Sequence, residues 1–540
     1  MAHYAKESAD SRLLIRNSAE TLSVTFYSGE TATDADGSVT VGITDEAGAT
    51  VVASGATTTS IVLIIRTGQP NLASKGNVHY QRITGMREEK LRALTRLALP
   101  LGDASVEVEL SDWMSPLVPD SGGDPWRAFP LLADLLPWQQ PGCKFGRTWP
   151  ISPSHTVLTT RWSRFLSTDD HADRAECFYT ASSGRTIDTR VTGLPVLAEL
   201  PIGRTSEQIA RYAYRSFDRQ WAFSDPRLAK TESPSLWSSS SPQQLFLTSK
   251  MSLPLGKGPA AVVTSDVPDL HYFCGRGGKD IIPLYRDAAG TPNVAADTLS
   301  TITTTHQAND DSVSAITPES LFCYAYGILA GADYTDRFAE ALETPGPRVP
   351  LTADPNLFAE VAAHGEYLLW LHTYGERLAS HGRPDTVPIS DSITWGREPS
   401  RIPENSRDFS FDSDKSELHV ADGVITGVGT KVWAFEVSGM QIVKKWLGYR
   451  TAKGAGRAAS SSSPLDHIRP TEWLPEWSEE LLELLTVLDK TLDLLPRGIE
   501  LLDRICDGPL IAATDLPPVP DDLRKPPKVI RASSQLTFGA

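Results

Sequence analysis

"SIVLIIRTG", residues 60–68, is the stretch that sets the fold class of this 540-residue chain. It is a continuous apolar run of strand length, which is typical of a strand buried on both faces of a sheet. "NVHYQRI" (77–83) follows as a second strand, and "MREEKLRALTRLAL" (86–99) as a helix with acidic residues in its first turn. Strands followed by such a helix predict the edge of an α/β domain, so we expect a mixed α/β fold.

The segment upstream, residues 1–59, differs in composition from everything after it. It is rich in Thr, Gly, Ala and Val, and short alternating runs are separated by Gly and Asp. This pattern is typical of small β-hairpins. Two interpretations stay open, a β-rich module and a leader that packs poorly by itself, and the second is favoured. No role is assigned to this acidic segment from its sequence.

Helical spacing recurs downstream, at 205–214, 318–343 and 355–380. A further helix is expected over 476–495, ended by Pro496. Its leucines share one face and are expected to pack inward: Leu481, Leu484, Leu485, Leu488, Leu492 and Leu495. The Pro-rich tail is expected to be extended. The sequence thus predicts a helical segment near the C-terminus.

Composition describes a globular chain of two to four domains, with 40% hydrophobic and 22% charged residues. No apolar run approaches the roughly 20 residues of a membrane helix, and no signal peptide is predicted at the N-terminus. Five scattered cysteines never form CxxC and indicate free thiols, which favours a reducing compartment. The expected location is therefore the cytoplasm, without membrane association.

Motifs for catalysis are missing from the sequence. There is no GxxxxGK[ST], no GxGxxG after a strand, no HExxH or paired Cys/His set, and no GxSxG. The run Glu88-Glu89-Lys90 resembles part of a nuclease centre, but a solvated helix face explains it better. We therefore predict no catalytic, cofactor-binding or metal-ligating residue.

Clusters of basic and aromatic residues are the main functional signal. "KVWAFEVSGMQIVKKWLGYRTAKGAGR" (431–457) holds six basic residues and one acid, although the whole chain has a formal net charge of -16. "PWQQPGCKFGRTW" (137–149), "RYAYRSFDRQW" (211–221) and "HYFCGRGGKDIIPLYRD" (271–287) are similar. Lys and Arg neutralise phosphates, Gln and Arg reach base edges, aromatic rings stack on bases, and glycines open the backbone. These clusters point to DNA.

Each cluster also has a structural interpretation. Arginine beside an aromatic ring is often cation–π packing on a surface. In 211–221 helical spacing would place Arg215 and Arg219 on one face, where pairing with Asp218 or Asp225 is a competing explanation. From these three clusters the candidate DNA-binding residues are Gln139, Lys144, Arg147, Arg215, Arg219, Arg276 and Lys279.

Read in order, the clusters resemble the C-terminal part of Type ISP restriction-modification enzymes, single-chain bacterial DNA translocases with methyltransferase and nuclease activities. The blocks that carry the resemblance include "VHYQRITGMREEKL", "PWQQPGCKFGRTWPISPS", "PDLHYFCGRGGKDIIPLYRD", "LFCYAYGILAGADYTDRFAEAL" and "SSPLDHIRPTEWLPEWSEELLELL". The resemblance extends from residue 60 onward. Ser216 stands where the family's pattern has Pro. The family's cofactor-binding glycine motif and its Asn-Pro-Pro-Tyr type motif are both missing.

The resemblance implies a domain organisation. It implies a truncated methyltransferase-like sheet edge and connector at 60–185, a target-recognition (specificity) domain at 186–525 and a tail at 526–540, after the leader 1–59. Residues 437–457 would be a strand followed by a basic turn. Phosphate contacts are then expected from Lys444, Lys445, Arg450, Lys453 and Arg457, and Tyr449 would fix the turn or approach the bases.

The resemblance also implies partners. Double-stranded DNA is expected, together with a separate chain that supplies the missing helicase and methyltransferase core. S-adenosylmethionine, ATP and Mg²⁺ are expected only of the full-length family, and no cofactor is expected in this chain. The chain alone is then a DNA-binding specificity module for adenine methylation and restriction, without catalysis of its own. The alternatives are a truncated or fused non-functional remnant, a subunit of a split methyltransferase, and an autonomous enzyme with an unrecognised site.

Overall fold

The computed structural model describes residues 123–180, 184–201, 208–275, 277–379, 382–453 and 463–528, together with Arg92 and seven short strands before residue 109. The chain divides into two compact units, Met1–Asp120 and Ser121–Ala540. Within the described ranges, no helix has both the length and the apolar character needed to cross a membrane. All five cysteines are free thiols, as their spacing predicts.

The first unit contains short strands. β2 (Ser23–Phe26), β3 (Val41–Thr44) and β4 (Thr50–Ala53) form an antiparallel sheet, which confirms the β-hairpins expected in residues 1–59. β6 (Val78–Tyr80) pairs antiparallel with β7 (Val106–Val108) and confirms the strand expected at 77–83. β5 (Ile65–Arg66) lies within the apolar run 60–68, which we expected to form a buried strand. It pairs parallel with β1 (Ile15–Arg16). Of the helix expected at 86–99, the structure describes only Arg92, which is helical.

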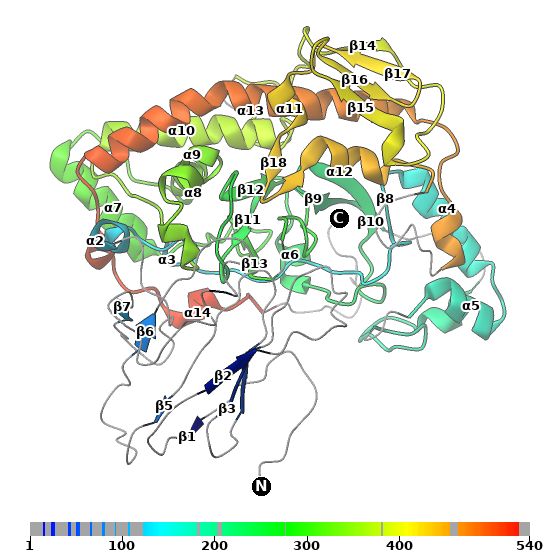
Figure 1. Ribbon diagram of the computed structural model, residues 1–540, viewed down its shortest axis with the longest axis horizontal. Helices are drawn as coiled ribbons and strands as arrows, with labels where there is room; N and C mark the ends of the chain where they lie inside the picture. The colour runs from blue at the N-terminus through cyan, green and yellow to red at the C-terminus, as the bar shows by residue number, and fades with distance from the viewer. Residues whose placement is uncertain are drawn as a thin grey trace. The chain divides into compact units, whose positions relative to one another are not determined.

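The second unit combines helices with four antiparallel sheets among its described residues (Figure 1). Two sheets have three strands: β8 (Ile151–Ser152), β10 (Asp218–Phe223) and β9 (Ile209–Arg215); and β12 (Ala261–Thr264), β11 (Phe246–Lys250) and β13 (Lys279–Pro283). A four-stranded sheet runs β14 (Thr394–Arg397), β17 (Gly423–Thr426), β16 (Glu417–Val420), β15 (Phe409–Asp412). β18 (Glu436–Val437) and β19 (Met440–Gln441) form a hairpin. The mixed α/β class is confirmed.

The helices of this unit surround those sheets. Their bounds are α2 (Gly123–Ala128), α3 (Leu132–Leu135), α4 (His155–Leu166), α5 (His171–Phe178), α6 (Pro234–Ser239), α7 (Ala296–Asn309), α8 (Pro318–Leu329), α9 (Ala332–Arg337), α10 (Pro355–His372), α11 (Thr430–Trp433), α12 (Ile442–Tyr449), α13 (Pro475–Asp507) and α14 (Asp521–Arg524). α8, α9 and α10 confirm the helices expected within 318–343 and 355–380.

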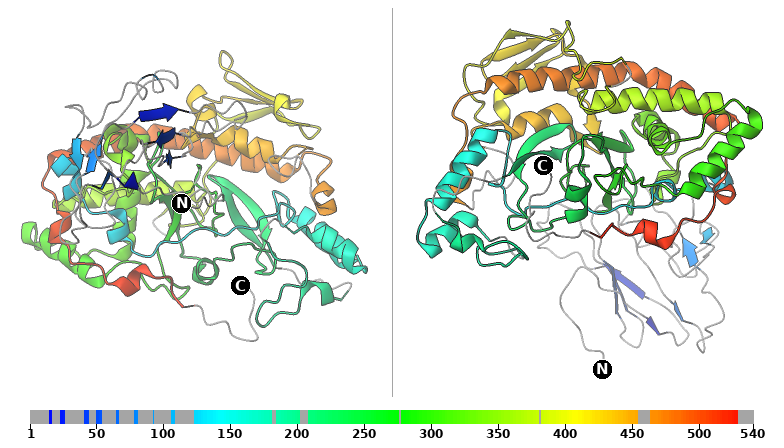
Figure 2. Two further views of the ribbon diagram at one scale, coloured as in Figure 1. Left: turned by 60° about the horizontal axis from the view of Figure 1, so that its bottom comes forward. Right: turned by 180° about the vertical axis from the view of Figure 1, so that it is seen from behind.

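The long helices α10 and α13 run side by side across one face of the unit, as Figure 1 and the rear view in Figure 2 show. α8 packs against α10 at very short range. A Cβ atom added to Gly365 would lie 1.8 Å from the carbonyl oxygen of Cys323, and one added to Gly327 would lie 2.8 Å from that of Val361. The crossing of these two helices therefore depends on both glycines.

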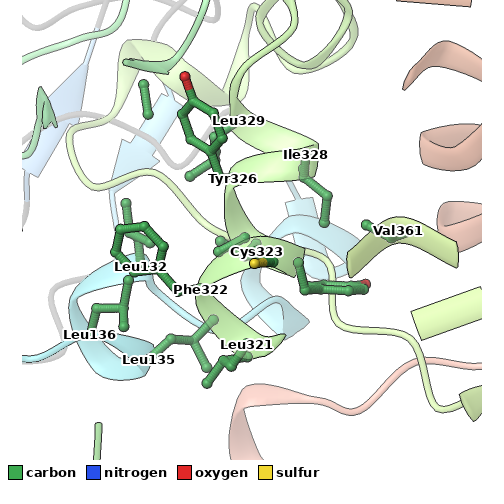
Figure 3. Packing of buried hydrophobic residues seen from close by; sticks show 14 of the residues in the cluster. Leu132, Leu135, Leu136, Leu321, Phe322, Cys323, Tyr326, Ile328, Leu329 and Val361 are labelled. Atoms are coloured by element: carbon green, nitrogen blue, oxygen red, sulfur yellow. The ribbon is translucent and has the colours of Figure 1, made fainter. Parts of the chain in front are cut away.

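Three hydrophobic clusters form the core of the second unit. In the first, Leu132 and Leu135 of α3 pack with Leu321 and Phe322 of α8 (Figure 3). The second lies under α12 and the first half of α13. The third joins residues 138–178 to strands β9, β10, β11 and β13. The segment that we assigned to a connector, up to residue 185, thus shares a core with the segment that we assigned to the specificity domain.

Three local expectations were wrong. Residues 209–215 form strand β9 rather than part of a helix. The stretch 442–449 is the helix α12 rather than a strand and turn. α13 continues through Pro496 to Asp507, because buried residues beyond the proline, such as Leu501, Leu502 and Ile505, hold its second half against the core. In the tail, the short helix α14 interrupts the extended chain.

Candidate nucleic-acid interface

The β9–β10 hairpin carries the arginines of the cluster 211–221. The turn is tight: Phe217 has a φ of 62°, and Ser216 donates from both its backbone N–H (2.9 Å) and its hydroxyl (2.7 Å) to the carbonyl of Tyr272. Proline, which the family's pattern has at this position, offers neither donor. Since this segment is a strand pair, Arg215 and Arg219 do not share a helical face.

Arg215 and Arg219 are both paired with acids from distant parts of the chain. Nη1 of Arg215 lies 2.9 Å from Oδ1 of Asp269. The Arg219 guanidinium contacts Glu376 at 2.9 Å and Glu483 of α13 at 2.7 Å, and it stacks 3.6 Å from the ring centre of Tyr374. The pairing partners are therefore not Asp218 and Asp225, which the helical interpretation suggested.

Arg450 joins α12 to the same hairpin. Its side chain is 0% exposed, and it contacts Asp218 at 3.0 Å and Glu480 at 3.2 Å. Arg211 meets the other oxygen of Glu480 at 3.2 Å. Arg211, Arg215, Arg219 and Arg450 with their carboxylates form what we call the arginine clamp. A fully buried, paired guanidinium cannot reach a phosphate without breaking these contacts, so the phosphate contact expected of Arg450 does not fit this conformation.

Arg147 likewise has a structural role. Its guanidinium donates to the carbonyl oxygens of Tyr179, Leu228 and Arg185 and stacks 3.9 Å from the ring centre of Phe178. Burial lowers the pKa of Arg147 to about 10. A buried arginine that satisfies backbone carbonyls fixes loops in place, and its donors are already in use. Arg147 is therefore not available to DNA in this conformation.

Three lysines converge elsewhere, around the turn 274–278. Lys279 donates from Nζ to the carbonyl of Gly275 (2.7 Å) and contacts Nδ1 of His271 (3.0 Å). Nζ of Lys250 lies 3.0 Å from the position a Cβ of Gly275 would take. Lys445, on α12, interacts electrostatically with Cys274, as do the other two. We call Lys250, Lys279 and Lys445 the lysine cluster.

The lysine cluster carries excess positive charge. In the part of the chain that the structure describes, none of the three ammonium groups has a carboxylate within ion-pairing distance. Burial is the main cause that lowers the pKa of each lysine, to about 8 for Lys279, and for Lys445 the nearby Arg215 adds to it. Crowded and partly dehydrated cations of this kind favour an anionic partner.

The backbone beside the lysine cluster is open. Gly275, Gly277 and Gly278 have φ values of 103°, 59° and 62°, a region that glycine adopts without strain. Among the described residues, the N–H groups of Gly277 and Gly278 have no acceptor. Nearby, the β18–β19 hairpin lies against this region, since Gly258 approaches the carbonyl of Glu436 and Gly275 approaches the hydroxyl of Ser438. Free amides in a glycine turn, beside lysines, suit an anion.

The remaining candidate DNA-binding residues lie at separate places. Lys444 and Lys453 are exposed, and Lys444 lies 5.0 Å from the ring centre of Trp433. Tyr449 is half-buried and packs edge-on against Tyr214. Lys144 is half-buried and its backbone pairs with that of Thr231.

Three candidates complete the set. Gln139 is half-buried, and its Oε1 has no hydrogen-bond partner within the described residues. Arg276 and Arg457 lie outside the described residues. Of the candidates, the structure therefore brings Lys279 and Lys445 together and leaves Lys444 and Lys453 exposed.

Sequence reasoning missed Lys250. It ends strand β11, "FLTSK", whose register sets it opposite Lys279 of β13. The signal was a basic residue at the end of an apolar strand, without an aromatic neighbour, so the search for basic and aromatic clusters passed over it. Only the pairing of two strands, which are 29 positions apart at these lysines, brings Lys250 to the glycine turn.

Comparisons with known proteins also point to a domain that recognises DNA. The family model of the Type ISP C-terminal specificity domain matches residues 134–484. No protein of curated function matches the chain in sequence.

Three solved structures resemble the chain. The first is the Type ISP restriction-modification enzyme LlaGI, as a nuclease-deletion mutant in complex with a DNA substrate mimic (16% identity, TM-score 0.48, 79% of this chain, 33% of that one). The second is a DrdV–DNA complex (16%, 0.51, 78% and 42%), and the third is the ATP-dependent Type ISP enzyme LlaBIII bound to DNA (15%, 0.53, 78% and 27%). The chain spans less than half the length of each. At such identities, the second and third likenesses establish the fold.

Proposed function

Because the chain belongs to the family of Type ISP C-terminal specificity domains, we propose that it is a double-stranded DNA-binding module that supplies target recognition to a restriction-modification system. Two kinds of observation support this. The chain shares its fold with DrdV and LlaBIII, whose structures are DNA complexes. Among the described residues of its second unit, lysines without a carboxylate partner lie beside backbone amides without an acceptor, which is the chemistry that phosphate needs.

The lysine cluster is the observation that carries the proposal. The clamp arginines neutralise internal acids and contribute no surplus charge, whereas Lys250, Lys279 and Lys445 have no acid within ion-pairing distance among the described residues. A DNA phosphate placed at the turn 274–278 would accept hydrogen bonds from the ammonium groups and from the amides of Gly277 and Gly278. The exposed Lys444, one residue from Lys445, would extend the contact along the strand.

The division of labour within the system is a further part of the proposal. Catalysis of adenine methylation and of restriction would come from a separate chain that carries the helicase and methyltransferase core. That chain would bind S-adenosylmethionine, ATP and Mg²⁺, and the module described here would provide specificity in the cytoplasm. A neighbouring reading frame that encodes such a core would support this split arrangement.

The test is a DNA-binding titration of the full chain by fluorescence anisotropy, at several salt concentrations. Lys250→Ala, Lys444→Ala and Lys445→Ala together should weaken binding to random duplex. The slope of log K against log salt should become shallower by about 1 for each phosphate that the triple variant no longer binds. Lys525→Ala, at an exposed lysine just after α14, is the matched control and should leave the slope unchanged.

Two results would count against the proposal. If the folded wild-type chain binds no duplex at low salt, the interpretation of the chain as a remnant gains support. If the triple variant and Lys525→Ala show the same decrease in affinity, the attraction is diffuse and the lysine cluster is not the site.

A further inference from the structure

We propose that the loop tip Ser252–Pro254, beside the lysine cluster, is an apolar wedge that inserts between two base pairs of a bound duplex and kinks it. The tip lies in "KMSLPLGKG" (250–258), between strands β11 and β12. The proposal rests on the proposed DNA binding and adds how the duplex is deformed. Base steps that open easily, such as TA and CA/TG, would then be preferred without a direct contact to their edges.

Leu253 and Pro254 project from a loop whose other apolar residues turn inward. Leu253 is 41% exposed, which makes it one of four large hydrophobic side chains exposed among the described residues, and Pro254 is exposed as well. Met251 is buried in the first hydrophobic cluster, and Leu255 packs against it. The ring of Pro254 also restricts the backbone of Leu253. Contact with bases would remove the cost of exposing this apolar pair to water.

Hydrogen bonds hold the chain on both sides of the tip. The N–H groups of Met251 and Ser252 donate to the carbonyl of Gly278, at 2.6 Å and 3.2 Å. Beyond the tip, the N–H of Leu255 donates to the carbonyl of Leu342 at 3.2 Å. Because the backbone is already fixed, insertion of the tip would cost little loop entropy, and such preorganisation favours binding.

The tip lies directly against the glycine turn that we assign to phosphate. A Cβ atom added to Gly278 would lie 2.7 Å from Cγ of Leu253, and one added to Gly277 would lie 3.3 Å from its Cδ1. Leu253 therefore contacts the two glycines whose N–H groups have no acceptor among the described residues. A phosphate bound by these amides would bring the sugar and base attached to it close to the leucine.

Cations stand on both sides of the tip in the sequence. Lys250, of the lysine cluster, precedes it, and the exposed Lys257 follows it. In the part of the chain that the structure describes, neither lysine has a carboxylate within ion-pairing distance. A duplex has the matching order, with phosphates outside and stacked bases between them. Leu and Pro are among the side chains that act as wedges in proteins that kink DNA by about 20–90°.

An anionic lipid surface also combines charge with an apolar interior. Segments that lie in such a surface usually bury the apolar face of a whole amphipathic helix, whereas this tip offers two adjacent apolar residues. The fold of the chain is moreover shared with DNA complexes. The observations therefore favour duplex DNA as the partner of the tip.

Energy transfer between dyes at the two ends of a short duplex measures the kink. Binding of the full chain should raise the transfer efficiency, because a kink brings the ends closer together. Leu253→Ser should lose most of this rise and weaken binding about two- to tenfold, while the slope of log K against log salt stays unchanged, since no phosphate contact is removed. Leu253→Met, which keeps an apolar side chain of similar size, should restore the rise.

Ile389→Ser is the matched control. Ile389 is also 41% exposed, but it lies in the loop before β14, near the acidic residues Asp385 and Asp391. A polyanion is not expected to approach this loop, so the rise in transfer should equal that of the wild type. Thermal denaturation checks that each variant is folded.

The outcomes separate the wedge from DNA binding itself. If the wild type binds duplex without a rise in transfer, or if Leu253→Ser keeps the full rise, the wedge is overturned and the proposed DNA-binding function stands. If the wild type binds no duplex, both are overturned. Flotation with vesicles of phosphatidylglycerol and phosphatidylcholine is the last arm: binding to vesicles and not to duplex would assign the tip to a membrane surface and overturn the proposal.

Discussion

Arg450 illustrates how one side chain can be predicted in type and mistaken in role. Its place in a basic stretch indicated a phosphate contact, but its partners are Asp218, 232 residues earlier, and Glu480, 30 residues later. Neither acid lies close to Arg450 in the sequence, so the residues around Arg450 do not reveal the pairing. The same holds for Arg219, whose acids are Glu376, in the bend after α10, and Glu483 of α13. Pairing across such separations decides whether an arginine is free, and only the fold specifies it.

Replacing Arg450 with Met should destabilise the second unit by about 3–5 kcal/mol, because Asp218 would be left buried without its charge partner. Urea denaturation followed by tryptophan fluorescence measures this. Lys453→Met, an exposed lysine three residues away, should stay within about 0.5 kcal/mol of the wild type.

Adding Asp218→Asn to the Arg450→Met variant should recover part of the stability, since the uncompensated charge is then removed. A single Arg450→Met variant as stable as Lys453→Met would show that the clamp contributes nothing.

His372 gives the second unit a predictable response to acid. The hydroxyl of Thr491 donates to Val487, so it accepts from Nε2–H of His372, and Nδ1 accepts from the hydroxyl of Tyr326. This arrangement holds the neutral ring, and burial lowers the pKa of His372 to about 3. The unfolded chain takes up that proton near its ordinary pKa of about 6.5. The stabilisation is therefore fully present above pH 6.5 and is lost as the pH falls from 6.5 toward 3.

Between pH 7 and pH 5 this residue should account for a loss of about 2 kcal/mol. Chemical denaturation of the wild type and of His372→Gln at several pH values measures it as a difference, which cancels the contributions of His271 and His364. Parallel curves for the two proteins would mean that His372 is protonated in the folded state.

At the scale of elements, the sequence predicted α8 and α10 well, because their apolar residues recur at helical spacing and a cap precedes each. Prediction from the sequence failed where the same residues fit both the period of two of a strand and the period of a helix. "RYAYR" alternates Arg and Tyr with a period of two, yet its arginines also fit one face of a helix. "IVKKWLGY" was too short to distinguish the buried set Ile442, Val443, Trp446 and Leu447 from a strand. Tertiary packing decides the structure of both stretches. It also explains why α13 continues past Pro496.

The crossing of α8 and α10 yields the prediction at this scale. Gly365→Ala should lower the stability of the second unit by more than about 3 kcal/mol, because the added carbon would overlap a backbone carbonyl, which cannot rotate away as a side chain can. Gly448→Ala, in α12, is the control: a Cβ there meets nothing within 4 Å, so helix propensity should stabilise by up to about 1 kcal/mol. Thermal denaturation compares the two, and equal midpoints would contradict the close crossing.

At the scale of the whole molecule, the boundary between the two compact units falls between Asp120 and Ser121, within the segment that the resemblance assigns to the methyltransferase remnant and connector, 60–185. The family resemblance could place the recognition domain roughly, because long blocks occur in order. It could not reveal that residues 138–178 share a core with β9 to β13. That arrangement depends on which apolar faces meet, and one sequence alone does not specify it.

A chain that begins at Ser121 should fold by itself, because the second unit contains three hydrophobic clusters of its own. Circular dichroism and thermal denaturation should show a cooperative transition within a few degrees of that of the same unit in the full chain, and duplex affinity should be kept. Absence of the transition would mean that residues 1–120 are part of the folded core.

The arginine clamp has a consequence for the folding of this protein during its synthesis on the ribosome. The hairpin arginines Arg211 and Arg219 are synthesised about half a chain before their acids on α13, which follow 269 and 264 residues later. At translation rates of about 5–20 residues per second, that interval is roughly 13–54 seconds. Throughout it Arg211 has no acidic partner, although Glu376 for Arg219 is made earlier, and the hairpin lacks its contacts with α13. Final closure of the recognition unit is therefore set by the pace of translation, and the emerging chain is a natural client for chaperones.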